Sequence, residues 1–198
     1  MRRTNYTLAA LALALLLSTA ARAQDAQPGG EQVKRVAEIQ AALREANLDG
    51  WLFYDFRHSD PLAYRILKLP TGGVTTRRWF YYVPVVGEPT RIVHSIERYR
   101  LDTLPGRKII YRSWEELHAA VRDALASGGL KNKRVVLKKI AMQYSPMGDI
   151  PYVARVDAGT VELVRSMSGV SVVTSADLVQ QFEATLTPEQ LAMHREAA

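Results

Sequence analysis

The stretch Asp49–Ile66, DGWLFYDFRHSDPLAYRI, constrains the fold more than any other part of the sequence. It contains an almost continuous apolar and aromatic run, Trp51–Phe56, which is interrupted only by Asp55. A continuous run, without alternation of apolar and polar residues, is typical of a strand that is covered on both faces. The sequence therefore predicts a buried strand in the interior of a sheet.

A charged loop follows this strand, and a new helix follows the loop. Asp60 and Pro61 have the character of a helix N-cap and of the first helical residue. Open α/β sheets often bind their ligands at the carboxyl ends of strands. The loop over residues 57–60 is therefore a candidate binding site.

Three side chains of this stretch are the candidate substrate-binding residues. Arg57 is suited to bind a carboxylate through two parallel hydrogen bonds, and His58 and Tyr64 are placed to frame that carboxylate. The alternative is that Arg57 pairs with Asp55 or Asp60 and only fastens the loop. The sequence leaves both interpretations open.

The first 23 residues have the pattern of a secretory signal peptide. Arg2 and Arg3 precede a short apolar core, Leu8–Leu17, and an A-x-A cleavage site ends at Ala23. The alternative, a transmembrane anchor, is disfavoured because the apolar run is shorter than the ~20 residues that a span needs. We expect the mature chain to be exported to the periplasm or secreted, and to begin with a polar linker over residues 24–30, QDAQPGG.

Charge and cysteine content exclude several classes of function. The formal net charge is +6, and removal of the three arginines of the signal lowers it to +3 (26 − 3 − 20). A mildly basic chain gives little support for a nucleic-acid or membrane partner, and we expect neither after signal cleavage. The basic cluster Lys131, Lys133, Arg134, Lys138 and Lys139 is either a solvated turn and strand edge or a polyanion site. Without cysteine, the chain has no disulfide and no thiolate metal site.

Residues 31–186 carry alternating helix and strand signals. Apolar residues at three- and four-residue steps predict a helix over Glu31–Ala46, which Asn47 closes in a left-handed conformation. Two aromatic and β-branched arms predict a β-hairpin over Arg77–His94, in which Pro84 indicates an edge strand or a bulge. The other predicted elements are a helix from Pro61, a short helix over Ile96–Leu104, a strand over Lys108–Tyr111, a helix capped by Ser113, a strand over Arg134–Ile140, a helix capped by Asp157 or Thr160, a strand over Val170–Val173, a helix from Ser175 to about Leu186, and a helix over Pro188–Ala198. The predicted fold class is α/β, a mixed sheet flanked by helices with one β-hairpin.

Motifs that carry catalysis are missing from the pattern. The four histidines are in no H-E-x-x-H or H-x-x-x-H arrangement, and there is no G-x-S-x-G elbow and no Gly-rich phosphate loop. His94 and Glu97 are three residues apart, so they either share a metal or make separate structural contacts. The aromatic run Trp79–Tyr82 either stacks nucleic-acid bases or, as its place in a hairpin favours, fills the core. We therefore predict no catalytic residue and no metal ligand in this chain.

Four segments in the same order resemble the amino-terminal domain of the pita-bread metallopeptidases. They are LREANLDGWLFYDFRHSDPLAYRI, RRWFYYVPVVGEPTRIVHSIE, IAMQYSPMGDIPYVARVDAGTVELVR and TSADLVQQFEATLTPEQLAMHREAA. The family includes Xaa-Pro aminopeptidase, prolidase and creatinase, and the resemblance implies a creatinase/prolidase-type, ribonuclease-H-like domain over residues 31–186. The chain departs from the pattern at Gln143, where relatives have Glu, and at Asn47, where many have Gly.

The resemblance also implies what lies outside the chain. In the family a carboxyl-terminal domain holds a pair of divalent metals that activates water, and residues 187–198 resemble the helix that enters that domain. The implied partners are this missing catalytic domain, or a separate chain that carries it, a peptide substrate, and a second copy in a homodimer. The implied function is that of an accessory domain of an exported Xaa-Pro peptidase; the alternative is a stand-alone pseudo-peptidase module that binds peptides or a protein.

Overall fold

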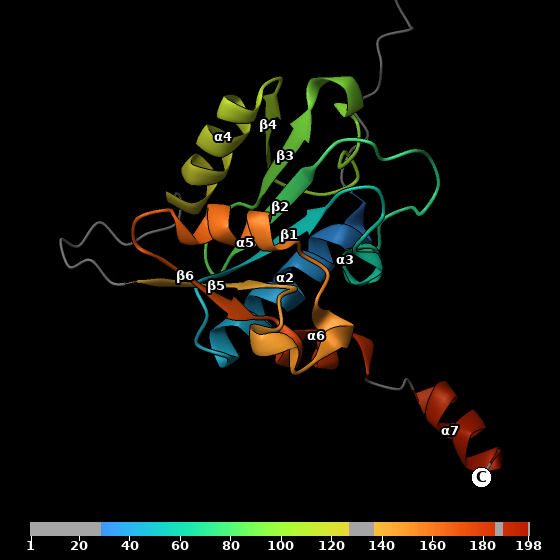
Figure 1. The fold of residues 1–198 in the computed structure, drawn as a ribbon. Coiled ribbons are helices and arrows are strands. Elements are labelled where there is room, and N and C mark those ends of the chain that lie inside the picture. Colours follow the sequence, from blue (N-terminus) through green and yellow to red (C-terminus); the bar gives the residue numbers. More distant parts are fainter. Residues whose placement is uncertain (1–28, 127–136, 185–187, 198) are drawn as a thin grey trace, which may run out of the picture.

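A computed structural model describes residues 29–126, 137–184 and 188–197, and its centre is a six-stranded mixed sheet (Figure 1). The strand order is β4-β3-β2-β1-β5-β6. The strands are β1 (Gly50–Asp55), β2 (Trp79–Pro84), β3 (Thr90–His94), β4 (Arg107–Tyr111), β5 (Lys138–Met142) and β6 (Val170–Thr174). β2 runs antiparallel to both β1 and β3, and the other neighbouring strands are parallel. The predicted mixed sheet with one hairpin is confirmed.

Helices cover both faces of the sheet. α2 (Gly30–Glu45), α3 (Pro61–Ile66) and α6 (Ala176–Glu183) lie on one face, and α4 (Trp114–Ala126) and α5 (Ala158–Arg165) lie on the other (Figure 1). Short 3-10 turns occupy Ser95–Glu97, Pro146–Gly148 and Pro151–Val153, and α7 (Pro188–Glu196) follows α6. α7 has no buried residue. Within the described ranges, no helix has the length and apolar character that crossing a membrane requires.

β1 divides the core into two parts, as its continuous apolar run predicts. All six of its residues are buried. Trp51 and Phe53 point to the α2–α3–α6 face, where their rings stack with centroids 4.4 Å apart. Leu52 and Tyr54 point to the α4–α5 face, because successive side chains of a strand alternate between faces. The strand ends at Asp55, one residue before the predicted end, and Phe56 is 37% exposed.

Local capping signals place the helix ends correctly. Asp60 accepts a hydrogen bond from the Ala63 N–H at 3.0 Å at the start of α3, and Asp157 accepts one from the Thr160 N–H at 2.8 Å at the start of α5. Asn47 has a φ of 53°, the left-handed conformation expected after α2. These contacts use neighbouring residues only, which is why the sequence reveals them.

Several predicted boundaries are wrong where long-range pairing decides them. Pro84 is the last residue of an interior strand, since β2 lies between β1 and β3 and Pro84 pairs with Gly50; it marks neither an edge nor a bulge. The helix predicted over Ile96–Leu104 is only a 3-10 turn at Ser95–Glu97 followed by turns. β5 extends to Met142, two residues beyond the predicted end at Ile140, because Ala141 and Met142 pair with β6. The signal peptide, most of the linker, and residues 131–136 of the basic cluster lie outside the described residues.

Candidate functional site

The candidate site is the loop between β1 and α3, and the buried carboxylate of Asp55 organises it. Asp55 Oδ1 accepts the Asp60 N–H at 3.0 Å, and Oδ2 accepts the His58 N–H at 3.2 Å and the Tyr64 hydroxyl at 3.0 Å. The Ser59 hydroxyl adds a contact at 3.5 Å. Hydrogen bonds from backbone N–H groups to a carboxylate are charge-assisted, so they hold the backbone of the loop in place. The polar interruption in the apolar run is therefore the anchor of the loop.

Arg57 and His58 both adopt left-handed backbone conformations, each with a φ of 58°. Residues with a β-carbon rarely adopt this region, so the hydrogen bonds to Asp55 must stabilise it. Within the part of the chain that the structure describes, Arg57 has no carboxylate partner, and its guanidinium lies 5.3 Å from the Phe56 ring centroid. The alternative that Arg57 pairs with Asp55 or Asp60 is not what the structure shows. Arg57 instead projects from the loop as an exposed cation.

His58 and Tyr64, the other two predicted site residues, lie against each other. Their ring centroids are 5.0 Å apart, and His58 Nε2 is 3.0 Å from the Gly73 carbonyl oxygen. His58 is exposed, whereas Tyr64 is buried behind it. Burial raises the pKa of the Tyr64 phenol above its ordinary value. Tyr64 is therefore a neutral hydrogen-bond donor to Asp55, and it supports the loop from behind.

Arg100 completes the site, and sequence reasoning missed it. Its Nη2 lies 3.2 Å from the Tyr64 hydroxyl and 3.3 Å from His58 Nε2, and it also donates to the Thr75 hydroxyl. Its Nη1 donates to the Gly72 carbonyl oxygen at 3.2 Å. These bonds use the donors of Arg100 to join residues 72–75 to the β1–α3 loop, so Arg57 is left as the available guanidinium.

Glu97 fixes Thr76, which follows residues 72–75 in the segment that connects α3 to β2. Its Oε1 accepts both the N–H and the hydroxyl of Thr76, each at 2.7 Å. Burial raises the pKa of Glu97, but the hydrogen bonds from Thr76 and Arg77 outweigh burial and hold this pKa below its ordinary value. His94 makes a separate contact, since its Nδ1 accepts the Ile96 N–H at 3.1 Å. Both residues therefore make structural contacts of the kind that the second interpretation describes.

Asp60 is a buried carboxylate of the loop with one oxygen left unsatisfied by the described residues. It is fully buried, and its Oδ2 has no hydrogen-bond partner among the described residues. Burial raises the pKa of Asp60 to about 7; the nearby charge of Asp55 raises it further, and the hydrogen bond from Ala63 opposes the rise. Asp60 therefore changes protonation state near neutral pH.

The chemical character of the loop is that of a binding site for an anionic group. An exposed guanidinium and an imidazole edge are suited to an anionic group such as a peptide carboxylate. No group of three or more His, Asp or Glu side chains in residues 29–126, 137–184 and 188–197 is placed to hold a metal ion. The aromatic side chains of Trp79–Tyr82 are buried in the core, so they do not form a stacking surface.

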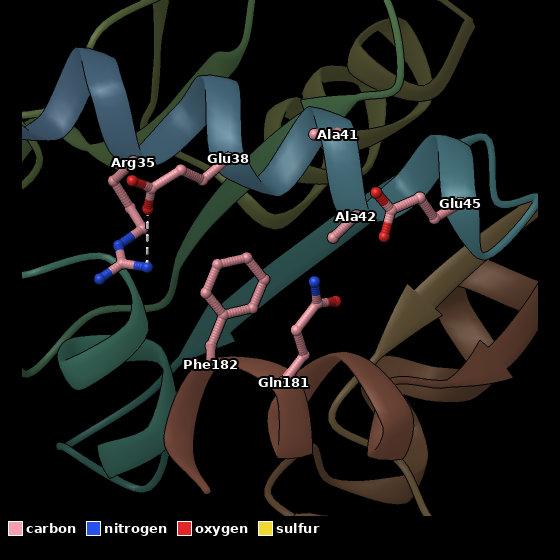
Figure 2. Close-up of a pocket in the computed structure, with 7 residues that line it drawn as sticks. All are labelled: Arg35, Glu38, Ala41, Ala42, Glu45, Gln181 and Phe182. Carbon is pink, nitrogen blue, oxygen red and sulfur yellow. Dashed lines mark ion pairs between the residues drawn. The ribbon is translucent and has the colours of Figure 1, made fainter. Parts of the chain in front are cut away.

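Two hollows flank α6, away from the loop. The larger, about 570 Å³, lies between α2 and α6, with Arg35 paired to Glu38 at 2.9 Å and stacked 5.2 Å from the centroid of the Phe182 ring (Figure 2). The smaller, about 330 Å³, lies between α6 and residues 150–153, where Tyr152 is 53% exposed. Neither hollow contains a residue of the β1–α3 loop.

Solved structures with a similar fold are proline-specific and related dipeptidases. A dipeptidase from Pyrococcus horikoshii OT3 matches with a TM-score of 0.57 and 15% identity, over 80% of this chain and 39% of that one. A recombinant prolidase from Thermococcus sibiricus matches with a TM-score of 0.56 and 13% identity, over 84% of this chain and 41% of that one. A proline dipeptidase from Streptococcus pneumoniae matches with a TM-score of 0.52 and 16% identity, over 76% of this chain and 98% of that one.

These matches establish the fold. The chain spans about two fifths of the length of the first two proteins and nearly all of the third. No protein-family model matches the sequence, and no curated protein matches it either. The expectation of a prolidase-type α/β fold, with a mixed sheet flanked by helices, is confirmed.

Proposed function

We propose that this chain is the amino-terminal accessory domain of an exported Xaa-Pro metallopeptidase. Its fold, which it shares with dipeptidases and prolidases, supports the proposal. Hydrolysis then belongs to a metal-binding domain with a pair of divalent ions, carried in the same polypeptide or in a separate chain. The accessory domain formed by the present chain promotes dimerisation, restricts access to the active-site cleft and positions the peptide substrate.

The rigid β1–α3 loop is the observation that carries the substrate-positioning role. Four hydrogen bonds to Asp55 hold the loop, and Arg57 projects from it without a carboxylate partner among the described residues. A pre-organised guanidinium binds a carboxylate without first losing its own ion pair. We assign Arg57 to the carboxylate of the peptide, His58 to a flanking hydrogen bond, and Tyr64 to the support of His58.

A peptide titration tests this assignment. The backbone amide signals of the chain are followed by NMR while alanyl-proline is added, and the titration is repeated with alanyl-proline amide, which lacks the carboxylate. We expect shifts at residues 56–59 with the free acid, and an affinity at least about tenfold lower for the amide and for Arg57→Gln, because charge-assisted hydrogen bonds are lost. Arg122→Gln, an exposed arginine of α4, is the matched control and should bind as the wild type does. Equal binding of acid and amide, or equal loss in both variants, contradicts the assignment.

One observation also favours a stand-alone peptide-binding module. The groups that hold the loop, among them Asp55, Tyr64 and Arg100, belong to the same sheet-and-helix unit as Arg57, so the loop can keep its shape without a second domain. The module predicts that the chain alone binds alanyl-proline as tightly as any larger complex does. The accessory domain predicts that affinity rises when a metal-binding domain is added, because the two domains then share the substrate.

Export belongs to the proposal as well. We expect the protein isolated from the periplasm or the culture medium to begin at Gln24, directly after the A-x-A site. Amino-terminal sequencing or intact-mass measurement checks this. A cell-associated product that retains Met1 contradicts it.

A further inference from the structure

A second surface, distinct from the β1–α3 loop residues, lies where β3 and β4 end and β2 begins. Arg77 lies shortly before β2, Arg98 follows the turn after β3, and Arg112 directly follows β4. Three large apolar side chains accompany them: Ile96, Tyr99 and Trp114. β3 and β4 are parallel, and their carboxyl ends lie at the same end of the sheet as the start of the antiparallel β2. We call these six residues the arginine face.

Two sets of hydrogen bonds and one ring contact join the three segments that carry the arginine face. The N–H and hydroxyl of Thr76 both bind Glu97, which ties the approach to β2 to the turn after β3. The Tyr111 hydroxyl donates to the Arg78 carbonyl oxygen at 2.7 Å, which ties the end of β4 to the start of β2. The His94 ring packs edge-on against Tyr111 with centroids 5.0 Å apart. Arg77, Arg98 and Arg112 each directly adjoin one of the residues so joined.

The arginines of this face have no ion pair within the described residues. The opposite ends of the same strands differ, since Arg91 pairs with Asp102 at 3.6 Å and Arg107 pairs with Asp123 at 2.8 Å. Carboxylates do lie near the arginine face, but they bind other groups. Glu97 binds Thr76, and Glu116 accepts the Arg112 backbone N–H at 2.7 Å. Arg77 Nη1 donates to the Thr76 carbonyl oxygen at 3.2 Å, and the Arg98 guanidinium lies 5.5 Å from the centroid of the Tyr99 ring. Neither contact neutralises the positive charge, so the guanidinium groups can still pair with an external carboxylate.

The apolar members of the face are largely exposed. Ile96 is 68% exposed, and Tyr99 and Trp114 are each 62% exposed. Arginine, tyrosine and tryptophan are the residues that contribute most to the affinity of protein–protein interfaces. We propose that the arginine face is a docking surface for a protein partner that presents carboxylates around an apolar side chain.

The nearby acids favour a protein over a polyanion such as nucleic acid or an anionic lipid surface. Glu97, Glu115 and Glu116 lie among the arginines, and their charges repel a continuous row of phosphates. A folded partner can place individual carboxylates on individual guanidinium groups and leave the glutamates untouched. The proposal does not involve Arg57, so it stands or falls independently of the proposed substrate site.

A labelled random copolymer of glutamate and tyrosine is the probe, because it offers carboxylates beside apolar rings. Its affinity for the full chain is measured by fluorescence anisotropy. We expect the triple variant Arg77→Gln, Arg98→Gln, Arg112→Gln to bind at least about tenfold more weakly than the wild type. The control variant Arg44→Gln, Arg122→Gln, Arg165→Gln removes the same charge from α2, α4 and α5 and should stay within about twofold. All six arginines lie at or near the surface, and circular dichroism confirms that both variants are folded.

Two further measurements separate the proposal from simple charge attraction. Replacement of the same three arginines by lysine keeps the charge but removes the planar fork, so it should also weaken binding several-fold. Trp114→Ser should weaken binding of the glutamate–tyrosine copolymer more than binding of polyglutamate. Equal losses in the arginine and control variants overturn the proposal. Tighter binding to phosphatidylglycerol vesicles or to single-stranded DNA than to the copolymer overturns it as well.

Discussion

Replacement of Asp60 by asparagine should stabilise the protein at neutral and alkaline pH. Asp60 is fully buried and its Oδ2 has no partner within the described residues, so its ionised form lacks solvation. Asparagine is as good an N-cap as aspartate, so Asp60→Asn keeps the hydrogen bond to the Ala63 N–H. The variant removes the buried charge and leaves the helix cap in place.

The size and the sign of the expected stability change follow from the pKa of Asp60. Burial raises the pKa of Asp60 from 3.8 to about 7 in the folded state. The folded state therefore binds this proton more tightly than the unfolded state, and the associated stability is present at low pH and lost as pH rises from about 4 to about 7. At about 1.4 kcal/mol per pKa unit, this shift of about three units corresponds to a loss of about 4 kcal/mol. The stability difference between Asp60→Asn and the wild type should grow by about this amount between about pH 4 and about pH 8.

Urea unfolding at several pH values measures the difference. Asp157→Asn is the matched control, because Asp157 caps α5 in the same way but is exposed. Burial raises the pKa of Asp157, but its bonds with Thr160 outweigh burial and hold this pKa below its ordinary value, so the Asp157 charge is favourable and its removal gives no gain at alkaline pH. A difference between Asp60→Asn and the wild type that does not change with pH, or a variant less stable than the wild type at alkaline pH, refutes the reasoning.

Two further substitutions test the packing and the support of the loop. Gly50→Ala should destabilise by about 1–3 kcal/mol, because its β-carbon would lie 2.7 Å from the Tyr82 hydroxyl oxygen in a filled core; Gly30→Ala, with open space around it, should not, and thermal denaturation compares the two. Arg100→Ala should release residues 72–75 and lower stability by about 1–3 kcal/mol, since it leaves the Tyr64 and Thr75 hydroxyls without this donor. Hydrogen exchange over residues 70–77 reports the release, and unchanged protection there would show that Arg100 does not hold the segment.

Local sequence signals predicted the helix caps and the core strand correctly. The N–H that Asp60 caps lies only three residues away, at Ala63, and Asn47 lies just after the helix that it closes. A short stretch of sequence therefore contains each capping residue together with its helix. The continuous run Trp51–Tyr54 already specified burial on both faces, because a strand with one solvated face needs alternating polarity.

The parts that the sequence did not reveal depend on distant partners. Arg100 lies 36 positions after Tyr64 and 25 after Thr75, and no local pattern distinguishes it from the arginines around it. Asp55 was visible as an interruption in an apolar run, but its role depends on four groups that converge on it only in the folded loop. Pro84 suggested an edge because proline lacks an N–H, yet its position at the end of β2 satisfies that limit inside the sheet.

The native complex of the protein provides the most direct test of the central proposal. Antibodies against residues 31–126 precipitate the protein from its source cells, and the precipitate is assayed for cleavage of Xaa-Pro peptides with and without a chelator. If this is the accessory domain of an Xaa-Pro metallopeptidase, the precipitate cleaves such peptides, the chelator abolishes cleavage, and divalent metal restores it. A precipitate that contains the protein but shows no chelator-sensitive Xaa-Pro cleavage contradicts the proposal.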